Sequence, residues 1–112
     1  VFLMTGIETI SAHDLDRYHG DRNVMIIDLR DREEYEAGHF DGAVNIPYEE
    51  LDIYEELPAD KILVLYCDRG SASLLAAREL MQRGFRVKSV VGGFHAYKGT
   101  NLYFPSEHSK IK

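Results

Sequence analysis

An uninterrupted aliphatic run, Ile62-Leu63-Val64-Leu65, most constrains what this chain can fold into. A strand with one face in water alternates apolar and polar residues, and this run does not alternate. It therefore predicts a strand covered on both faces, as in a parallel sheet that lies between layers of helix. A short loop with a glycine and then a helical pattern reaching Arg83 follow the strand.

The rest of the chain repeats this alternation of strand and helix. Strands are expected at 8–10, 24–29, 43–46, 61–66 and 85–91. Helices are expected at 11–18, 31–37, 48–57 and 71–83, with a further helical turn at 94–97 and a loop at 39–42. The pattern predicts an α/β fold of three layers, with about five mainly parallel strands flanked by helices on both faces.

Length and composition indicate one domain that needs no disulfide. The chain has 112 residues and one cysteine. We expect an N-terminal arm at 1–8, the domain at 9–99 and a tail at 100–112 that packs on the domain or trails from it. A single cysteine and the lack of a long apolar run favour a cytoplasmic protein. The net charge of -6 argues against binding to nucleic acid or to anionic membranes.

Cys67 stands at the junction between the aliphatic strand and the following helix. Ligands of open α/β sheets bind outside the carboxyl ends of the strands, so this junction is a candidate site. A helix that begins near Ser71 would aim unpaired backbone N–H groups at the sulfur and favour a thiolate. Arg69 adds a positive charge to the loop, whereas Asp68 opposes it.

The other loop residues fit the binding of an anion. Gly70 allows a positive φ or a close approach of the backbone to a ligand. Ser71 and Ser73 could cap the helix or donate hydrogen bonds to an anion. A lone cysteine is more often an inert buried residue, but an inert residue requires neither a glycine loop nor a helix N-terminus beside it.

Several blocks of the sequence together resemble the single-domain rhodanese family of sulfurtransferases. They are Ile27-Asp28-Leu29-Arg30 with Glu34-Tyr35, the segment from Gly38 to Pro47, the cysteine loop, and the segment from Val91 to Tyr97. The resemblance runs from about Thr9 to Gly99 and implies a rhodanese-like fold. It also implies that Cys67 is the nucleophile that accepts sulfur and that the loop residues Asp68, Arg69, Gly70, Ser71, Ala72 and Ser73 bind the substrate.

The loop departs from the family pattern at Ala72, where many members have a basic residue. Thiosulfate is a dianion and would benefit from a second cation. Asp28 and Arg30, at the end of the second strand, could line the pocket, but a structural ion pair is the more frequent role of such residues. His39 is interpreted as a tie for loop backbone, and no histidine has a metal-binding spacing with Cys67, so we expect neither a metal nor a cofactor.

The resemblance implies a sulfurtransferase that moves sulfur from thiosulfate or a persulfide, through a Cys67 persulfide, to a thiol or cyanide acceptor. The alternative is a binding module that relays sulfur from a partner protein or senses oxidants, with little turnover. Cysteine phosphatases share the strand, loop and helix layout. Their pattern would place a phosphate-clamping arginine at position 73, where this chain has Ser73, so the sequence favours sulfur chemistry.

Overall fold

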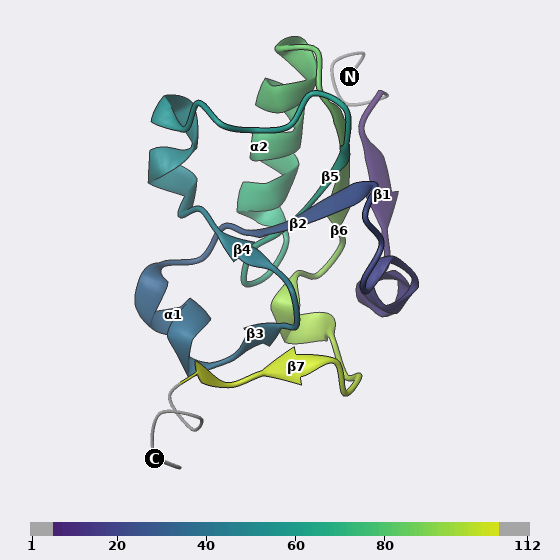
Figure 1. Ribbon diagram of the computed structural model, residues 1–112, viewed down its shortest axis with the longest axis vertical. Coiled ribbons are helices and arrows are strands. Elements are labelled where there is room, and N and C mark those ends of the chain that lie inside the picture. The colour runs from purple at the N-terminus through teal and green to yellow at the C-terminus, as the bar shows by residue number, and fades with distance from the viewer. Residues whose placement is uncertain (1–5, 106–112) are drawn as a thin grey trace.

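The computed structural model describes residues 6–105, and its centre is a parallel sheet. The strands of this sheet are β1 (Glu8–Ile10), β2 (Val24–Asp28), β4 (Val44–Asn45), β5 (Ile62–Tyr66) and β6 (Arg86–Val90). Their order is β1-β6-β5-β2-β4, and every neighbouring pair is parallel (Figure 1). The predicted α/β fold with about five mainly parallel strands is confirmed.

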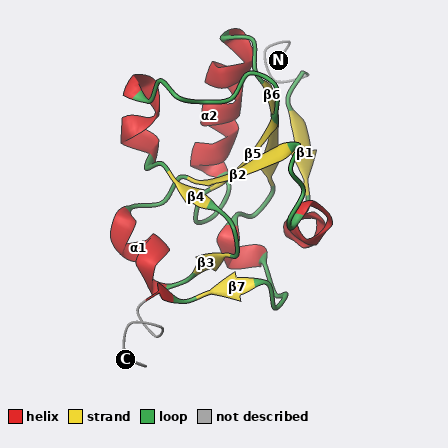
Figure 2. Ribbon diagram, viewed as in Figure 1, coloured by secondary structure: helices red, strands yellow, loops and turns green. Residues whose placement is uncertain are grey.

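Both faces of the sheet are covered, as the aliphatic run of β5 predicts. Leu63 and Leu65 pack into one core with helix α2 (Ser71–Gln82) and the 3₁₀ helix η3 (Tyr48–Ile53). Val64 and Tyr66 point to the other face, into a core that includes residues of the 3₁₀ helices η2 (Ala12–Tyr18) and η4 (Phe94–Ala96). These four side chains of β5 are fully buried. The helical layers are shown in Figure 2.

Capping boxes start two of the helices. Ser11 and Asp14 exchange side-chain and backbone hydrogen bonds at the start of η2. Asp31 and Glu34 do the same at α1 (Arg32–Ala37), which ends at Gly38. The predicted helix at 48–57 is wrong in its second half, because η3 ends at Ile53. Leu51 is the one buried residue of η3, so a short helix is enough to bury its apolar side.

A second sheet was missed by the sequence analysis. His39 and Phe40 form β3 (His39–Phe40), which pairs antiparallel with β7 (Leu102–Tyr103). The sequence analysis predicts a loop at 39–42 and no strand beyond 99, because a strand of two residues is too short to have a period. Through β7, the first residues after position 99 pack on the rest of the fold.

The predicted arm and tail lie partly outside the described residues, namely at 1–5 and 106–112. Within residues 6–105, no helix has both the length and the apolar character to cross a membrane.

Candidate active site

A pocket of ≈ 460 Å³ opens at the carboxyl ends of β2 and β5. This is the edge of the sheet where the sequence predicted a site. Its wall comes from the end of β2, the start of α1, η3 and the loop between β5 and α2. The lining residues are Leu29, Arg30, Asp31, Glu34, Tyr48, Glu49, Cys67, Asp68, Arg69, Ser71 and Ala72.

Cys67 lies in this pocket and is held by the backbone of its own loop. The residue is only 6% exposed. Its Sγ accepts a hydrogen bond from the N–H of Gly70 at 3.0 Å and another from the N–H of Ser73 at 3.4 Å. Two N–H donors directed at one sulfur stabilise negative charge on that sulfur.

The loop and the start of α2 hold further backbone donors. In the described part of the chain, the N–H groups of Arg69, Ser71 and Ala72 donate to no protein acceptor. Helix α2 begins at Ser71 without a side-chain cap, which leaves the orphan N–H groups of its first turn available. A ring of such groups is suited to a compact anion next to Cys67.

Two glycines, one in the loop and one in the segment behind it, allow the two segments to pack closely. Gly93 has φ +63°, and a Cβ there would lie 2.5 Å from the carbonyl oxygen of Cys67. A Cβ on Gly70, at φ +106°, would lie 2.9 Å from the backbone nitrogen of Gly92. The Phe94 N–H donates to the Cys67 carbonyl at 2.8 Å and the His95 N–H donates to the Asp68 carbonyl at 3.0 Å. The 93–95 segment is therefore a support for the loop.

Sequence reasoning did not assign this supporting role. The signal was present as the Gly92-Gly93 pair directly after a strand, which the sequence analysis used only as part of a family-like block. The sequence alone does not show that this pair contacts the cysteine loop, because the contact joins segments that are distant along the chain.

The structure places the predicted loop residues in different roles. Asp68, Arg69, Ser71 and Ala72 line the pocket, whereas Gly70 and Ser73 do not. The Ser73 hydroxyl is engaged inside the protein. Ser73 is fully buried, and its Oγ donates to the Gly70 carbonyl at 3.1 Å and lies 2.9 Å from Ser89 Oγ. Ser73 instead contributes its backbone N–H.

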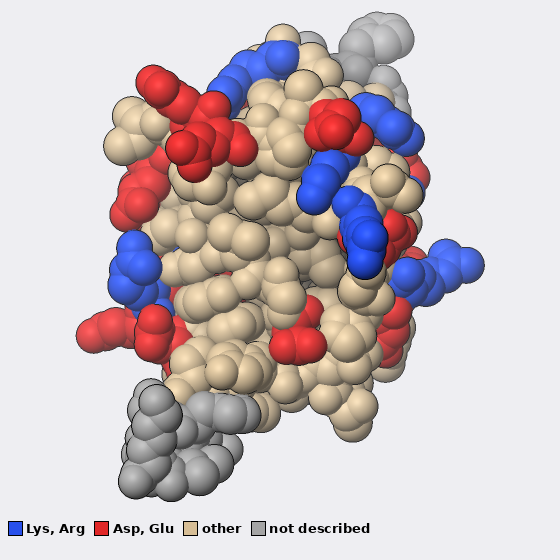
Figure 3. Space-filling model, viewed as in Figure 1, with Lys and Arg blue, Asp and Glu red and all other residues tan. Residues whose placement is uncertain are grey.

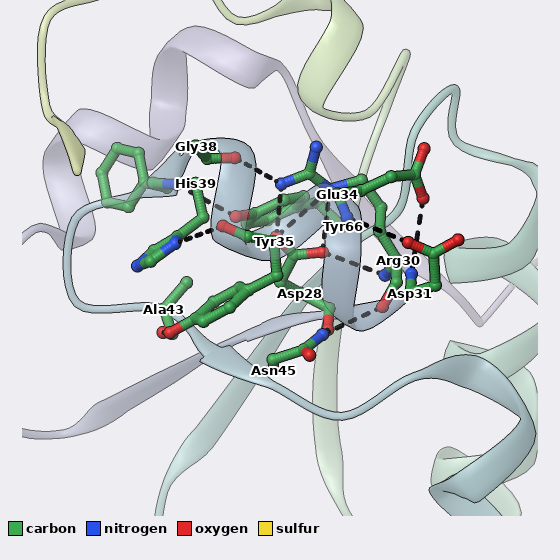
Figure 4. Close-up of polar contacts among 11 residues, drawn as sticks. Asp28, Arg30, Asp31, Glu34, Tyr35, Gly38, His39, Ala43, Asn45 and Tyr66 are labelled. Atoms are coloured by element: carbon green, nitrogen blue, oxygen red, sulfur yellow. Dashed lines mark hydrogen bonds and ion pairs between the residues drawn. The ribbon is translucent and has the colours of Figure 1, made fainter. Parts of the chain in front are cut away.

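Asp28 and Arg30 form a buried ion pair beside the pocket (Figure 4). Arg30 Nη2 lies 2.7 Å from Asp28 Oδ2, and Arg30 Nε lies 3.0 Å from Asp28 Oδ1. Nη2 also donates to the Gly38 carbonyl at 2.8 Å, so the pair joins β2 to the end of α1. Arg30 lines the pocket, but Asp28 is fully buried and does not, because the guanidinium covers it.

Aromatic rings complete this buried network. The Arg30 guanidinium carbon lies 4.2 Å from the centroid of the Phe94 ring. Burial, reinforced by the nearby Asp28 carboxylate, raises the pKa of Tyr66 far above its ordinary value. The Tyr66 hydroxyl therefore stays neutral, and its oxygen accepts a hydrogen bond from the N–H of Phe40 at 3.0 Å.

His39 lies outside the pocket lining and contacts backbone, as the sequence analysis interpreted it. Its Nδ1 is 2.9 Å from the Tyr35 carbonyl, and its ring stacks on the Tyr35 ring at a centroid distance of 3.7 Å. Among residues 6–105, no group of three or more His, Cys, Asp or Glu side chains is arranged to hold a metal ion.

Comparison with protein families gives a match to the rhodanese-like domain over residues 11–100. This chain belongs to the rhodanese-like domain family. The match covers most of the chain, including β2, the cysteine loop, α2 and the supporting 93–95 segment. The fold agrees, because a rhodanese-like domain protein from Staphylococcus aureus superposes with a TM-score of 0.77. That structure is 25% identical and is covered over 97% of its length by 87% of this chain.

Two relatives of this chain have names that refer to sulfur transfer. The thiosulfate sulfurtransferase GlpE of Shewanella oneidensis is 34% identical over 100 residues, which cover 88% of this chain and 99% of that protein. A tRNA sulfurtransferase of Desulfurococcus amylolyticus is 39% identical over 87 residues. That stretch is 78% of this chain but only 17% of the longer protein.

Proposed function

We propose that this chain is a sulfurtransferase that carries sulfur on Cys67. The donor is thiosulfate or a persulfide, and the acceptor is a thiol or cyanide. The first half of the cycle loads Cys67 with one sulfur atom, and the second half unloads it. Sulfurtransferases of similar length, such as the GlpE protein of Shewanella oneidensis, support this assignment.

The chemistry of the first half needs no outside oxidant. The Cys67 thiolate attacks the outer sulfur of the donor and forms a new S–S bond. The S–S bond of the donor breaks, and its electron pair leaves with sulfite or with the thiolate of the donor. In the second half the acceptor attacks the terminal sulfur, which regenerates the Cys67 thiolate.

The observation that carries the proposal is the direction of the loop N–H groups. Those of Gly70 and Ser73 already donate to Sγ, at 3.0 and 3.4 Å. The Arg69, Ser71 and Ala72 N–H groups have no protein acceptor in the described residues, and all three residues line the pocket, so these groups are available to a second sulfur next to Sγ. Such preorganised donors stabilise the charge on the terminal sulfur in both halves of the cycle.

The same geometry supports sulfur rather than phosphate as the transferred group. A phosphoryl group distributes its charge over three oxygens in the transition state and depends on a cationic clamp. Position 73 would hold the arginine of a phosphatase loop, and Ser73 there is fully buried and bonded to Ser89. A terminal sulfur is one compact anion, which backbone donors are sufficient to hold.

Intact mass spectrometry tests the proposal. The reduced protein is incubated with thiosulfate or with glutathione persulfide, and we expect a gain of about 32 Da, roughly one sulfur atom. Cyanide should then remove the added mass and form thiocyanate. Cys67→Ser is a clean control because the chain has one cysteine.

Three results separate the hypotheses. An unchanged mass with every donor, or a gain that persists in Cys67→Ser, would overturn the proposal. Rapid loading followed by one slow release, without repeated turnover, would favour the relay or sensing module instead. Release of phosphate from p-nitrophenyl phosphate that depends on Cys67, without persulfide formation, would make the chain a phosphatase.

A further inference from the structure

The charged side chains around the Cys67 pocket are mostly acidic. Carboxylates from three elements line it, those of Asp31, Glu34, Glu49 and Asp68, against two guanidinium groups. Figure 3 shows acidic atoms gathered over α1 and over η3, the unlabelled teal helix of Figure 1. The side chains that line the pocket are therefore mostly negative, whereas the Cys67 sulfur itself is held by backbone donors.

The two cations of the pocket are already paired. Arg30 lies 2.7 Å from the buried Asp28, so together they add no net charge to the site. Arg69 lies 3.6 Å from Asp68 on the exposed side of the loop. Ala72, which lines the pocket, supplies no further charge. The loop itself thus contributes little net positive charge to attract a dianion.

Three of the lining carboxylates form no ion pair: those of Asp31, Glu34 and Glu49. Within residues 6–105, none of the three lies within 4 Å of a cationic nitrogen. Asp31 and Glu34 bond only to each other's backbone N–H groups, at 2.9 and 3.4 Å. All three residues are exposed, so their charges act on whatever enters the pocket. We call these three side chains the acidic rim.

We propose that the acidic rim selects the sulfur donor, and that the preferred donor is an organic persulfide with a cationic group close to its sulfur. This inference rests on the sulfurtransferase function proposed above and names its substrate class. A cationic head group would lie against the rim while the terminal sulfur reaches the loop N–H groups. Thiosulfate is a dianion, so the same three carboxylates repel it as it approaches the loop.

The chemistry of loading stays balanced with such a donor. The Cys67 thiolate attacks the outer sulfur of the persulfide and forms the Cys67 persulfide. The S–S bond of the donor breaks, and its electron pair leaves on the thiolate of the cationic carrier. The ammonium group of the carrier stabilises that departing thiolate, so the donor needs no further cation from the protein.

A matched set of donors tests the proposal. Cysteamine persulfide, 2-mercaptoethanol persulfide and 2-mercaptoethanesulfonate persulfide share a two-carbon chain and differ in a cationic, neutral or anionic head group. The measurement is the second-order rate constant for the mass gain of about one sulfur atom on Cys67. We expect the cationic donor to load at least about tenfold faster than the anionic one at low salt, and the ratio to shrink as salt screens the rim.

Variants locate the effect. In the rim variant Asp31→Asn, Glu34→Gln, Glu49→Gln, the loading rate constant for the cationic donor divided by that for the anionic donor should be close to one. The control variant Glu33→Gln, Glu36→Gln, Glu50→Gln removes the same charge from the same two elements, and none of its residues lines the pocket. The control should keep most of the wild-type ratio. If the rim variant fails to fold, Glu49→Gln alone, outside the capping box, should lower the ratio by about twofold to threefold.

The outcomes distinguish this inference from the function on which it rests. Equal loading by all three donors, or faster loading by the anionic donor, overturns the acidic rim but leaves the sulfurtransferase intact. An equal loss of the ratio in the control variant also overturns it, because the net charge of the protein would then be the cause. No loading by any donor would remove the proposed function and this inference together.

Discussion

The cysteine loop and the Asp28–Arg30 network lie on adjacent sides of the pocket but are built differently. The loop is held by its main chain, through N–H groups on Sγ and glycines that allow close packing behind it. The network is held by side chains, through a buried ion pair and a carbonyl. We infer that the main chain supplies the chemistry and the side-chain network supplies the stability. The following predictions test this division.

The largest effect on stability is expected from Asp28→Asn. This change leaves the buried Arg30 guanidinium without its counter-charge. We expect the free energy of unfolding, measured with urea, to fall by about 3 kcal/mol. The rate at which the folded protein takes sulfur onto Cys67 should fall by less than about tenfold, because the loop donors are untouched. Asp41→Asn, which removes an exposed partner of His19, is the matched control and should cost less than about 1 kcal/mol. An equally small cost for Asp28→Asn would contradict the role of the network.

The next largest effect should come from Gly93→Ala, with the opposite balance between function and stability. The added methyl group would lie 2.5 Å from the Cys67 carbonyl oxygen, so the loop must shift. We expect sulfur uptake by Cys67 to fall about 100-fold and stability to fall by about 2 kcal/mol. Gly42→Ala separates backbone strain from collision, because Gly42 has φ +90° with nothing within 4 Å of its added Cβ. Equal losses of uptake in both variants would mean that the close packing behind the loop is irrelevant.

Tyr66→Phe sharpens the comparison at a smaller scale. It removes the oxygen that accepts the buried Phe40 N–H at 3.0 Å, and an orphaned buried donor costs about 1–2 kcal/mol. Urea denaturation should detect that loss, while the mass-based loading rate of Cys67 should stay within about threefold of wild type. A loss of loading as large as that of Gly93→Ala would show that the network controls the loop.

The smallest effect concerns the exposed carboxylate of Asp16. Hydrogen bonds from the Tyr97 hydroxyl and from the Asn101 side chain lower the pKa of Asp16. This stabilisation is therefore complete above about pH 4, the ordinary aspartate value, and is lost as the pH falls through the lowered folded value. The difference in urea midpoint between wild type and Asp16→Asn should shrink over that acid range. A difference that stays constant from pH 6 to pH 2.5 would exclude this linkage.

The sequence was sufficient for the elements with a strong pattern. The aliphatic run of β5 predicted a strand with two covered faces, and the cysteine, glycine and serine residues after it predicted a loop that enters a helix. These features are local, since neighbouring residues along the chain determine them. The helix N–H groups near Cys67 followed from the same local pattern.

Features that depend on contacts between distant segments could not be predicted in this way. The support from Gly93 becomes visible only when the end of β6 lies behind the cysteine loop. The short strands β3 and β7 have no period of their own and exist because they pair with each other. The sequence allowed the Ser73 hydroxyl to bind an anion, but in the fold this hydroxyl forms a hydrogen bond with the hydroxyl of Ser89 on β6.

The position of β1 at the edge of the sheet has a consequence for synthesis of the protein. In the main sheet β1 pairs only with β6, and Glu8 lies opposite Lys88. Along the chain β1 precedes the other strands of this sheet, so it is synthesised before them. Its partner β6 emerges only after β2, β4, β5 and α2 are complete. During translation β1 therefore stays without its strand partner until β6 has been synthesised, so the pairing of β1 with β6 is a late event.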